Sequence, residues 1–387
     1  MNSFIIMLLV LGLTQGSITG IIFLLLRNKD RSLKWLGLFL IAYSMPFITW
    51  LFVRAGLVEK YPRIDFLPIG LHFAVMPLFY LYAKSLTSTL NRATIRRNLL
   101  PALVEVVHYT IICCLSEQAF QLFIQGPYLR VYVLVYTLGL NAFSIGYAAR
   151  VIHLVQRHQD KVLGFYSDLH GRWLGWVKLT AWANITIGVL DIVVIYLIYN
   201  YVDKQLYLML SVAYSVVMIY WVAISGLRQS NTAISFPVEN APVPISPLVS
   251  AGLPVEQLAL PESEEGENKA EEDVGQQADF EQITRFMERG AYKDSDLTLA
   301  GLADQLGLSY KKVSSLINEK AGMNFNKFVN QYRVEEAKRL LSNSAYDHLN
   351  HVGIAQAAGF QTKSTFYRMF REFTGVTPNA YKKEIPH

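Results

Sequence analysis

The most informative segment of the chain lies near its C-terminal end and reads GFQTKSTFYRMFR at residues 359–371, followed by GVTP at residues 375–378. Its apolar residues Phe366, Met369 and Phe370 fall at positions i, i+3 and i+4, the pattern of a helix with one buried stripe. The same spacing leaves a row of polar side chains on the outer face: Lys363, Ser364, Tyr367, Arg368 and Arg371. Donors of these types on a short helix match base edges and phosphates, so the segment predicts a DNA-recognition helix.

A similar arrangement occurs about fifty residues earlier in the chain. A short apolar helix is predicted over residues 299–306, Gly307 ends it, and Ser309 is a good N-cap for a second helix over 310–319. The later copy has a short helix before Gly359 and a recognition helix over 362–372. A helix predicted over 326–342, about 25 Å long at ~1.5 Å per residue, joins the two helix-turn-helix units. Such a rod would let both recognition helices enter successive major grooves, about 34 Å apart.

Many positions between about 280 and 383 fit one known pattern: Leu302-Ala303, Gly307-Leu308-Ser309, Leu316-Ile317, Gly322, Phe325, Phe328-Val329, Tyr332-Arg333, Ala337, Leu340-Leu341, Ile354-Ala355, Ala358-Gly359-Phe360, Phe366, Phe370, Gly375-Val376-Thr377-Pro378 and Tyr381. On these residues the chain resembles the AraC/XylS-type transcription regulators, in a membrane-bound variant. The resemblance implies a DNA-binding domain of two helix-turn-helix units. By position it assigns DNA contacts to Lys311, Ser314, Ser315 and Asn318 in the first unit and to Lys363, Ser364, Thr365 and Arg368 in the second. Arg368 is the expected base reader, whereas phosphate contact or plain solvation explains Lys311 and Lys363 equally well.

Three positions depart from that pattern. His351 stands where the family usually has an apolar residue, Gly353 where it often has an acidic one, and Lys382 where arginine is common. A glycine inside a helix costs roughly 0.5–1 kcal/mol. We therefore expect the second unit to bind DNA less tightly than the first.

The first 230 residues predict a bundle of membrane-spanning helices instead. Residues 4–26 carry no charge and are long enough to cross ~30 Å of hydrocarbon, and the positive charges follow this run, unlike those of a signal peptide. Six more spans are expected at residues 35–53, 67–83, 99–115, 128–149, 173–199 and 205–225, which makes about seven, with six or eight as alternatives. Alternate loops hold 12 Lys and Arg against 5 in the others. The positive-inside rule then places the N-terminus outside and the C-terminal domain in the cytoplasm, with the chain in the bacterial inner membrane.

Four ionisable residues fall inside these spans and are candidate sensor residues, because each is costly to place in hydrocarbon. Glu105 and His108 are three positions apart and could pair on one helix face. Asp191 lies in the sixth span and His72 in the third. One interpretation is a polar cavity that senses a small ligand. The other is hydrogen bonding that holds the helices together.

Charge and proline content separate the two regions. Residues 239–279 hold 10 Asp and Glu against 1 Lys, after several prolines, which is typical of a flexible linker. The domains are therefore expected at 1–230 (membrane), 231–279 (linker) and 280–387 (DNA-binding). The linker is interpreted as a solvated spacer, or alternatively as an acidic competitor of DNA.

The sequence thus predicts an all-α, membrane-anchored regulator that binds promoter DNA, and not an enzyme. The expected partners are double-stranded promoter DNA, the lipid bilayer, RNA polymerase, a second copy of the chain and an unidentified small-molecule or membrane-protein effector. No metal or cofactor site is expected, since the cysteines, Cys113 and Cys114, are adjacent. Two alternatives remain: a membrane transporter or enzyme with a regulatory tail, and spans that serve as a tether until the linker is cleaved.

Overall fold

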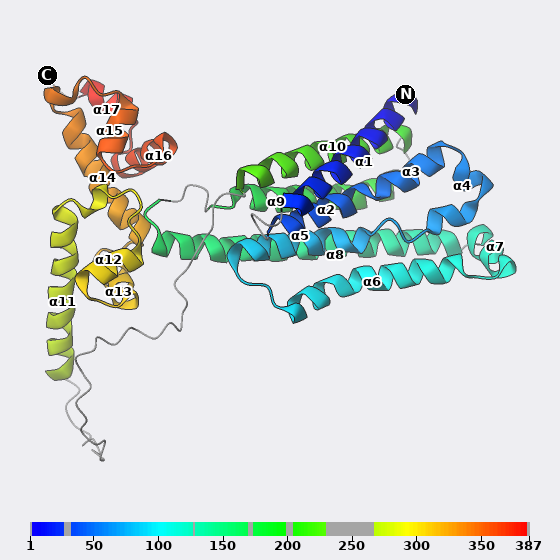
Figure 1. Cartoon of the computed structure of the whole chain (residues 1–387), viewed down its shortest axis with the longest axis horizontal. Coiled ribbons are helices and arrows are strands. Elements are labelled where there is room, and N and C mark those ends of the chain that lie inside the picture. Colours follow the sequence, from blue (N-terminus) through cyan, green and yellow to red (C-terminus); the bar gives the residue numbers. More distant parts are fainter. Residues whose placement is uncertain are drawn as a thin grey trace, which may run out of the picture. The chain divides into compact units, whose positions relative to one another are not determined.

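The computed structural model describes residues 2–26, 32–126, 128–168, 173–198, 204–229 and 267–384. The chain divides into two compact units, residues 1–158 with 174–234, and residues 159–173 with 235–387. In the described residues the regular secondary structure of both units is helical (Figure 1), and an isolated β-bridge joins Tyr166 and Thr298. The all-α fold predicted from the sequence is confirmed.

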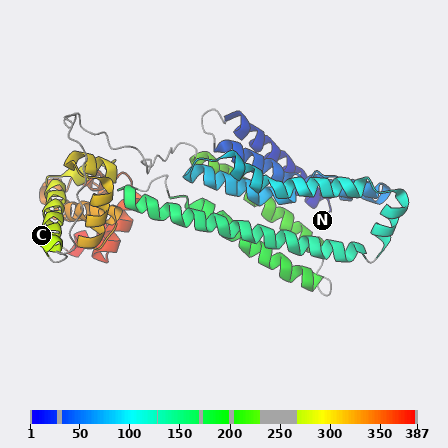
Figure 2. The same ribbon diagram turned by 90° about the horizontal axis from the view of Figure 1, so that it is seen from below.

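The first unit consists of helices that run side by side (Figure 2). Its elements are α1 (Asn2–Leu26), α2 (Leu33–Ser44), α3 (Pro46–Arg54), α4 (Leu57–Lys60), the 3-10 helix η1 (Pro62–Phe66), α5 (His72–Thr87), α6 (Arg92–Cys113), α7 (Glu117–Gln125), α8 (Tyr128–Phe165), α9 (Gly175–Ile198) and α10 (Lys204–Gln229). Helix α1 packs against α2 and α10, and α5 packs against α2 and α6. Many apolar side chains of α1, α8, α9 and α10 stay exposed, as expected of helices whose solvent is lipid.

Five helical stretches in the described residues are long and apolar enough to cross a membrane: Ser3–Leu26, Leu33–Arg54, Leu129–Phe165, Gly175–Val194 and Gln205–Gln229. The count is six if α6 and α7, which meet at 109°, form one broken span. The expected third span, residues 67–83, is displaced along the chain, because α5 runs from His72 to Thr87. The seven-span topology therefore stays a prediction.

Glycines hold α1 and α2 at close range. Gly12, Gly16 and Gly20 follow one another at every fourth position of α1 and so share a face. A Cβ on Gly20 would lie 2.7 Å from the carbonyl oxygen of Gly37, and a Cβ on Gly37 would lie 2.6 Å from that of Gly20. The two backbones touch at this crossing, which is how small residues let helices associate in lipid.

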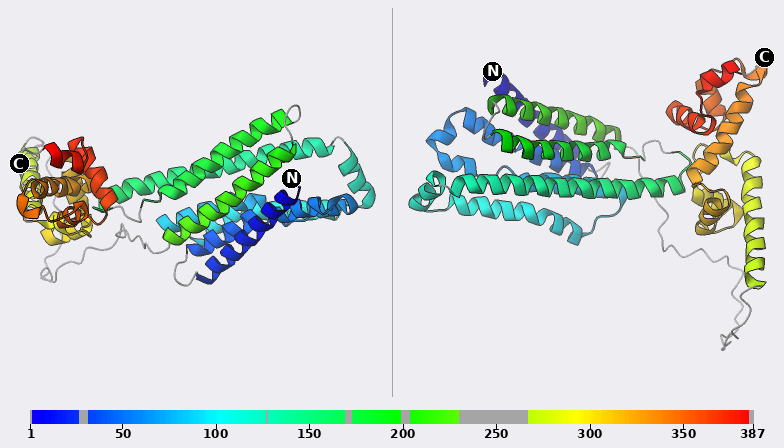
Figure 3. Two further views of the ribbon diagram at one scale, coloured as in Figure 1. Left: turned by 90° about the horizontal axis from the view of Figure 1, so that it is seen from above. Right: turned by 180° about the vertical axis from the view of Figure 1, so that it is seen from behind.

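The second unit contains the predicted pair of helix-turn-helix units. Its elements are α11 (Glu267–Glu288), η2 (Ala291–Lys293), α12 (Leu299–Leu306), α13 (Tyr310–Lys320), α14 (Phe325–Leu341), η3 (Ser344–Tyr346), α15 (His351–Ala357), α16 (Lys363–Thr374) and α17 (Pro378–Glu384). Figure 3 shows α12 and α13 at one end of α14 and α15 to α17 at the other.

Helix α14 belongs to two hydrophobic cores. Phe325, Phe328 and Val329 near its start join the core of α11, α12 and α13. Val334 and the residues after it join the core of α15 and α16, which includes Phe366. The predicted connecting rod is therefore an integral part of both units.

Two domain boundaries differ from those expected. Helix α11 begins at Glu267, so the last part of the expected linker is helical. Glu, Lys, Gln and Ala are good helix formers, and Ile283 and Met287 anchor the end of α11 in the first core. Residues 231–266 of the expected linker lie outside the described residues, whereas the acidic residues Glu271, Glu272 and Asp273 lie in α11. The two interpretations of the linker stay predictions. The other difference is that residues 159–173, expected in the membrane domain, pack with the C-terminal unit.

Candidate nucleic-acid interface and polar cavities

The first recognition-type helix, α13, presents most of its predicted DNA-contacting side chains to solvent. Gly307 ends α12 with φ of 67°, and the Ser309 hydroxyl accepts a hydrogen bond from the N–H of Lys312 at 3.2 Å. The apolar side chains of α13 are buried, as predicted: Val313, Leu316 and Ile317. Lys311, Ser315 and Asn318 are exposed and Ser314 is half-buried. The sequence pattern thus separates the packed face from the polar face correctly.

The second recognition-type helix, α16, is built in the same way. Thr362 caps it by accepting from the N–H of Thr365 at 3.2 Å, and Phe366, Met369 and Phe370 are buried. Three predicted contact residues are exposed: Lys363, Ser364 and Arg368.

Thr365 is the exception among the predicted DNA-contacting residues. Its side chain is 8% exposed, and its hydroxyl interacts with Thr362 at 2.9 Å and with the Asp168 carboxylate at 3.4 Å. Thr365 lies four residues before the buried Met369 and therefore on the packed side of α16, and the outer face defined by the apolar spacing does not include it. Thr365 is buried in this structure, and its contact with DNA, which the resemblance implies, stays a prediction.

The two residues of α15 that depart from the family pattern, His351 and Gly353, have a local structural explanation. The Asn350 side chain accepts hydrogen bonds from the N–H groups of Val352 and Gly353, at 3.0 and 2.9 Å, so this glycine lies in the capped first turn. His351 lies 6.2 Å from the Tyr367 ring, centroid to centroid. Partial burial, with the nearby Lys382, lowers the pKa of His351, which favours the neutral ring. Weaker DNA binding by the second unit stays a prediction.

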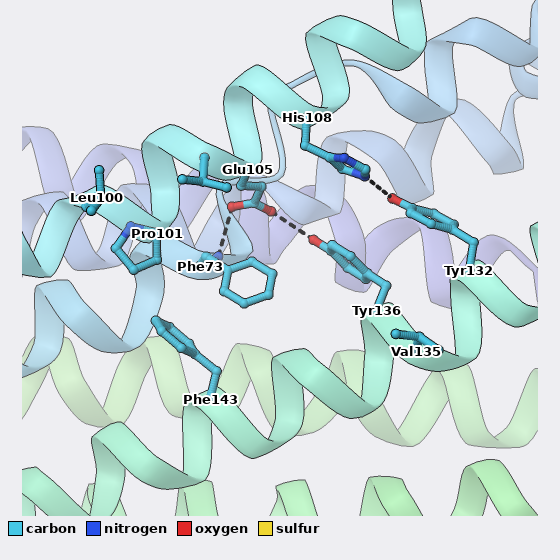
Figure 4. Close-up of a pocket in the computed structure, with 10 residues that line it drawn as sticks. Phe73, Leu100, Pro101, Glu105, His108, Tyr132, Val135, Tyr136 and Phe143 are labelled. Atoms are coloured by element: carbon cyan, nitrogen blue, oxygen red, sulfur yellow. Dashed lines mark hydrogen bonds between the residues drawn. The ribbon is translucent and has the colours of Figure 1, made fainter.

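The ionisable residues of the first unit form a hydrogen-bonded cluster around Glu105. This carboxylate accepts from the backbone N–H of Phe73 and from the Tyr136 hydroxyl, both at 2.9 Å (Figure 4). It also accepts from the backbone N–H of His72 at 3.0 Å. Leu71, just before α5, has φ of 47° and provides no side-chain cap. Glu105 of α6 therefore caps α5 from outside, where a negative charge also complements the helix dipole.

Glu105 and His108 do not pair with each other. They lie on one face of α6, as predicted, but Glu105 is 3.0 Å from the Nδ1 of His72. His108 is 3.1 Å from the hydroxyl of Tyr132 on α8 (Figure 4). The pairing that the spacing made available is thus not used in this structure: the two side chains interact with partners on α5 and α8.

Two cavities meet at this cluster. A mostly apolar cavity of about 500 Å³ is lined by Glu105, His108 and Tyr136 together with apolar side chains of α6 and α8. A larger one, of about 870 Å³, is lined by His72, Tyr136 and Asp191. The larger cavity also carries many uncharged polar side chains, including Asn141, Asn184, Ser211 and Ser215. The four predicted sensor residues are thus divided between two adjoining cavities, with Tyr136 lining both.

Asp191 and Asn184 give the larger cavity its polar character. The Tyr207 hydroxyl donates to the Asp191 carboxylate at 2.9 Å. The Oδ1 of Asn184 is shielded from solvent and accepts no hydrogen bond from the described residues. No group of three or more His, Cys, Asp or Glu suitable for a metal ion occurs in the described parts of the chain.

A family described as a helix-turn-helix domain matches residues 302–384, and its members are of the AraC type. The chain carries an AraC-type helix-turn-helix domain. Among curated proteins, the transcriptional activator NphR of Rhodococcus is 31% identical over 112 residues, which are 29% of this chain and 32% of that protein. The regulatory protein PocR of Salmonella typhimurium is 35% identical over 95 residues, or 24% of this chain and 30% of that protein. The chain thus spans about a third of the length of these relatives.

A solved structure gives a similar match. The C-terminal domain of the two-component response regulator yesN from Fusobacterium nucleatum is 31% identical, with a TM-score of 0.24. The match covers 26% of this chain and 95% of that domain.

The AraC-type domain also contains a buried polar stripe that the sequence analysis did not single out as a site. Asn326, Asn330 and Arg333 of α14 are each 0% exposed. Their spacing of four and three residues places them on one helix face, and this polar spacing on a packed helix was the available signal. The Nε of Arg333 donates to the carbonyl oxygen of Tyr292 at 2.7 Å. Burial lowers the pKa of Arg333 to about 10. Nearby carboxylates, of which Asp168 has the largest effect, act in the opposite direction and raise this pKa.

Proposed function

We propose that the chain is a membrane-anchored transcription regulator whose AraC-type domain binds promoter DNA. The observation that carries the proposal is the pair of recognition-type helices, α13 and α16. Each is capped at its start and buries an apolar stripe, and each exposes donors, among them Lys311 and Arg368. Such a pair on one shared helix suits two-site recognition of double-stranded DNA.

DNA binding is tested with the fragment 267–387 and labelled duplexes at several salt concentrations. We expect Arg368→Ala to weaken binding to a preferred sequence by about 1–3 kcal/mol, or roughly 5- to 150-fold. Lys363→Ala should instead weaken binding to all sequences and lower the salt slope by about 0.9. The matched control is Arg285→Ala, an exposed cation of α11 paired with Glu281. Binding that neither varies with salt nor responds to Arg368→Ala would contradict the proposal.

The membrane part of the proposal rests on the apolar helices and on the distribution of positive charge. With the basic loops inside, the N-terminus lies outside and the AraC-type domain lies in the cytoplasm. In a protein with Cys113 and Cys114 replaced by Ser, Gln121→Cys in α7 should then react with an impermeant maleimide in intact cells. Ser88→Cys, between α5 and α6, should not. The opposite labelling would invert the topology and would put the DNA-binding domain on the wrong side.

We further propose that the larger cavity holds the effector. It combines a carboxylate, Asp191, with an acceptor, the Oδ1 of Asn184, that has no hydrogen-bond partner among the described residues. In the proposed topology Asp191 lies toward the outer end of α9 and His72 at the outer end of α5, whereas Asn184 lies near the middle of α9. The occupant would be a small polar molecule with hydrogen-bond donors that arrives from outside the cell.

The effector proposal is tested by thermal stabilisation of the purified chain against a library of small polar solutes. A hit should stabilise the wild type but not Asp191→Asn or Asn184→Leu, and should change transcription from a reporter promoter. His108→Phe is the control, because His108 lines the smaller cavity. Equal stabilisation of all four proteins would contradict the assignment of the larger cavity.

Two protein partners follow from this role. A regulator bound at a promoter acts on RNA polymerase, and two copies of the chain held in one membrane would raise the effective concentration of their DNA-binding domains. Crosslinking in membranes tests the second copy, and a transcription assay with purified polymerase tests the first.

A further inference from the structure

A short segment after the long helix α8 docks on the AraC-type domain, within the same compact unit. Its residues Phe165, Tyr166, Ser167 and Asp168 contact elements that lie 130 to almost 200 positions away in the sequence. Tyr166 and Asp168 are 9% and 3% exposed. The small exposed surface of these two residues indicates that the segment is packed in a specific binding site on the domain.

The backbone of this segment is recognised by the buried polar stripe of α14. The Asn326 side-chain amide donates to the carbonyl oxygens of Tyr166 and Ser167, at 3.1 and 2.8 Å. The Asn330 amide donates to the Ser167 carbonyl at 3.1 Å, and the Arg333 guanidinium donates to the Ser167 hydroxyl at 3.1 Å. The docked segment thus gives each of these three buried side chains an acceptor, which a polar group out of water requires.

The same segment is also fixed from the side of α12. The Ser167 hydroxyl donates to the carbonyl oxygen of Leu297 at 2.7 Å, and Tyr166 forms a single antiparallel bridge with Thr298, the N-cap of α12. Side-chain and backbone contacts therefore agree on one register for the segment.

The position of the segment bears on DNA binding because it bridges the first turns of both recognition-type helices. The Phe165 ring lies 5.6 Å from the ring of Tyr310, the first residue of α13. Three residues later the Asp168 carboxylate accepts from the hydroxyl of Thr365, in the first turn of α16. Helices of this kind read DNA with their N-terminal residues. The segment accordingly contacts the first turn of both recognition-type helices, the end with which such helices approach DNA.

The contact between Asp168 and Thr365 also resembles a contact between a DNA phosphate and a hydroxyl group. A carboxylate and a phosphate both place anionic oxygens on hydroxyl donors, and both are favoured at the start of a helix. Asp168 holds such oxygens against Thr365, one of the side chains expected to contact DNA.

We propose that residues 165–168 compete with DNA within the same chain. The segment binds between the two recognition-type helices, and it must dissociate before the AraC-type domain can bind a promoter. The partner of the surface formed by Asn326, Asn330 and Arg333 is thus an extended segment of this same chain. The inference rests on the proposed DNA-binding function and adds its regulation. Helix α8 is continuous from Tyr128 to Phe165 and carries Tyr136, which lines both cavities. The segment and the cavity-lining Tyr136 are thus joined by the same helix.

The direct test locks the segment in place by a reversible bond in the full-length protein. Residues opposite each other in an antiparallel bridge have Cα atoms about 4.5–5.5 Å apart, within the range that a disulfide spans. The variant is Tyr166→Cys with Thr298→Cys, with Cys113 and Cys114 replaced by Ser. Its probe is a labelled duplex enriched from a random pool by the reduced variant itself, and the same protein before and after dithiothreitol is its own control.

We expect the oxidised form to bind this duplex at least about tenfold more weakly than the reduced form. A tenfold loss of affinity means that the fraction of molecules with the segment released is about ten times smaller in the oxidised form. Dithiothreitol should restore binding. Equal affinities of the two forms, or failure of the bridge to close under oxidation, would overturn the proposal. If the reduced form and the fragment 267–387 both fail to bind any duplex, the DNA-binding function itself is refuted, and the competition with it.

A second pair of variants reports the same competition without a crosslink. Asp168→Ala removes the carboxylate that lies on Thr365, and Asp160→Ala removes an exposed carboxylate from the end of α8. The two changes alter net charge equally. We expect the full-length Asp168→Ala protein to bind DNA several-fold more tightly than wild type and Asp160→Ala to bind like wild type. Equal effects of the two would mean that charge alone is responsible, which contradicts docking at this site.

Discussion

Replacing Gly359 by alanine should destabilise the AraC-type domain far more than the same change at Gly375. Gly359 lies between α15 and α16 with φ of 93°. A Cβ built on it would lie 2.7 Å from the carbonyl oxygen of Tyr292 and 2.8 Å from the Cα of Lys293. Both are backbone atoms of η2, and the Tyr292 carbonyl is also the acceptor of the buried Arg333. The loop can yield to the new methyl group only by lengthening that hydrogen bond.

The expected magnitude has two parts. A left-handed conformation costs an alanine about 1–2 kcal/mol. Overpacking against a backbone that cannot move away adds about 1–3 kcal/mol. Gly375 has φ of 78° with nothing within 4 Å of its Cβ position, so Gly375→Ala should show the first part alone. The difference of about 1–3 kcal/mol corresponds to a thermal midpoint that is lower by roughly 4–12 °C for a domain of this size.

The assay is thermal unfolding of the fragment 267–387, followed by circular dichroism at 222 nm, for the wild type and both variants. Because both substitutions add one methyl group at a positive φ, the comparison isolates the contact with η2. Equal midpoints for the two variants would show that η2 moves freely away from Gly359 and that its packing there is loose.

Three further predictions concern packing, capping and pH. Gly20→Leu should place side-chain atoms against the Gly37 carbonyl and lower the yield of folded full-length protein from membranes. The yield is measured by fluorescence size-exclusion chromatography, and a normal yield would exclude the close crossing of α1 and α2. Glu105→Leu should leave the first N–H groups of α5 without an acceptor and destabilise the first unit by about 1–3 kcal/mol, measured as a lower thermal aggregation temperature, with Glu105→Gln intermediate. The ion pairs with Arg339 and Lys293 lower the pKa of Glu336 to about 2, so their stabilisation is complete above the ordinary pKa near 4.5 and is lost as pH falls toward 2. Unfolding of the 267–387 fragment between pH 6 and 2.5 should show this loss, and Glu336→Gln should reduce it.

The sequence predicts the AraC-type domain well because its signals are local. Gly307 and Gly359 both adopt positive φ at the expected turns, and Ser309 caps the helix that it precedes, as predicted. Apolar spacing then separates the buried face of each recognition-type helix from its exposed face. Each of these features depends on residues within one or two turns of each other.

What the sequence analysis missed depends on contacts between distant residues. The hydroxyl of Thr365 donates to Asp168, which lies 197 positions earlier, and no periodic pattern reports such a contact. Glu105 was identified as costly in hydrocarbon, but its partners His72 and Tyr136 lie on other helices. The spacing of Gly12, Gly16 and Gly20 is visible in the sequence and predicts a close helix crossing. It was missed because the hydropathy of the whole apolar run, which identified the span, does not distinguish glycines from larger apolar residues.

The shared helix α14 sets the angular phase of the two reading helices as well as their separation. Its early residues, up to Val329, belong to one core and its later residues, from Val334, to the other. One residue inserted between them would turn the second unit by about 100° around the helix axis and move it by ~1.5 Å. Both cores could still form, but α16 would point away from the groove that α13 enters. The length of this short stretch is therefore constrained by the pitch of DNA, and substitutions should be tolerated there far better than insertions or deletions.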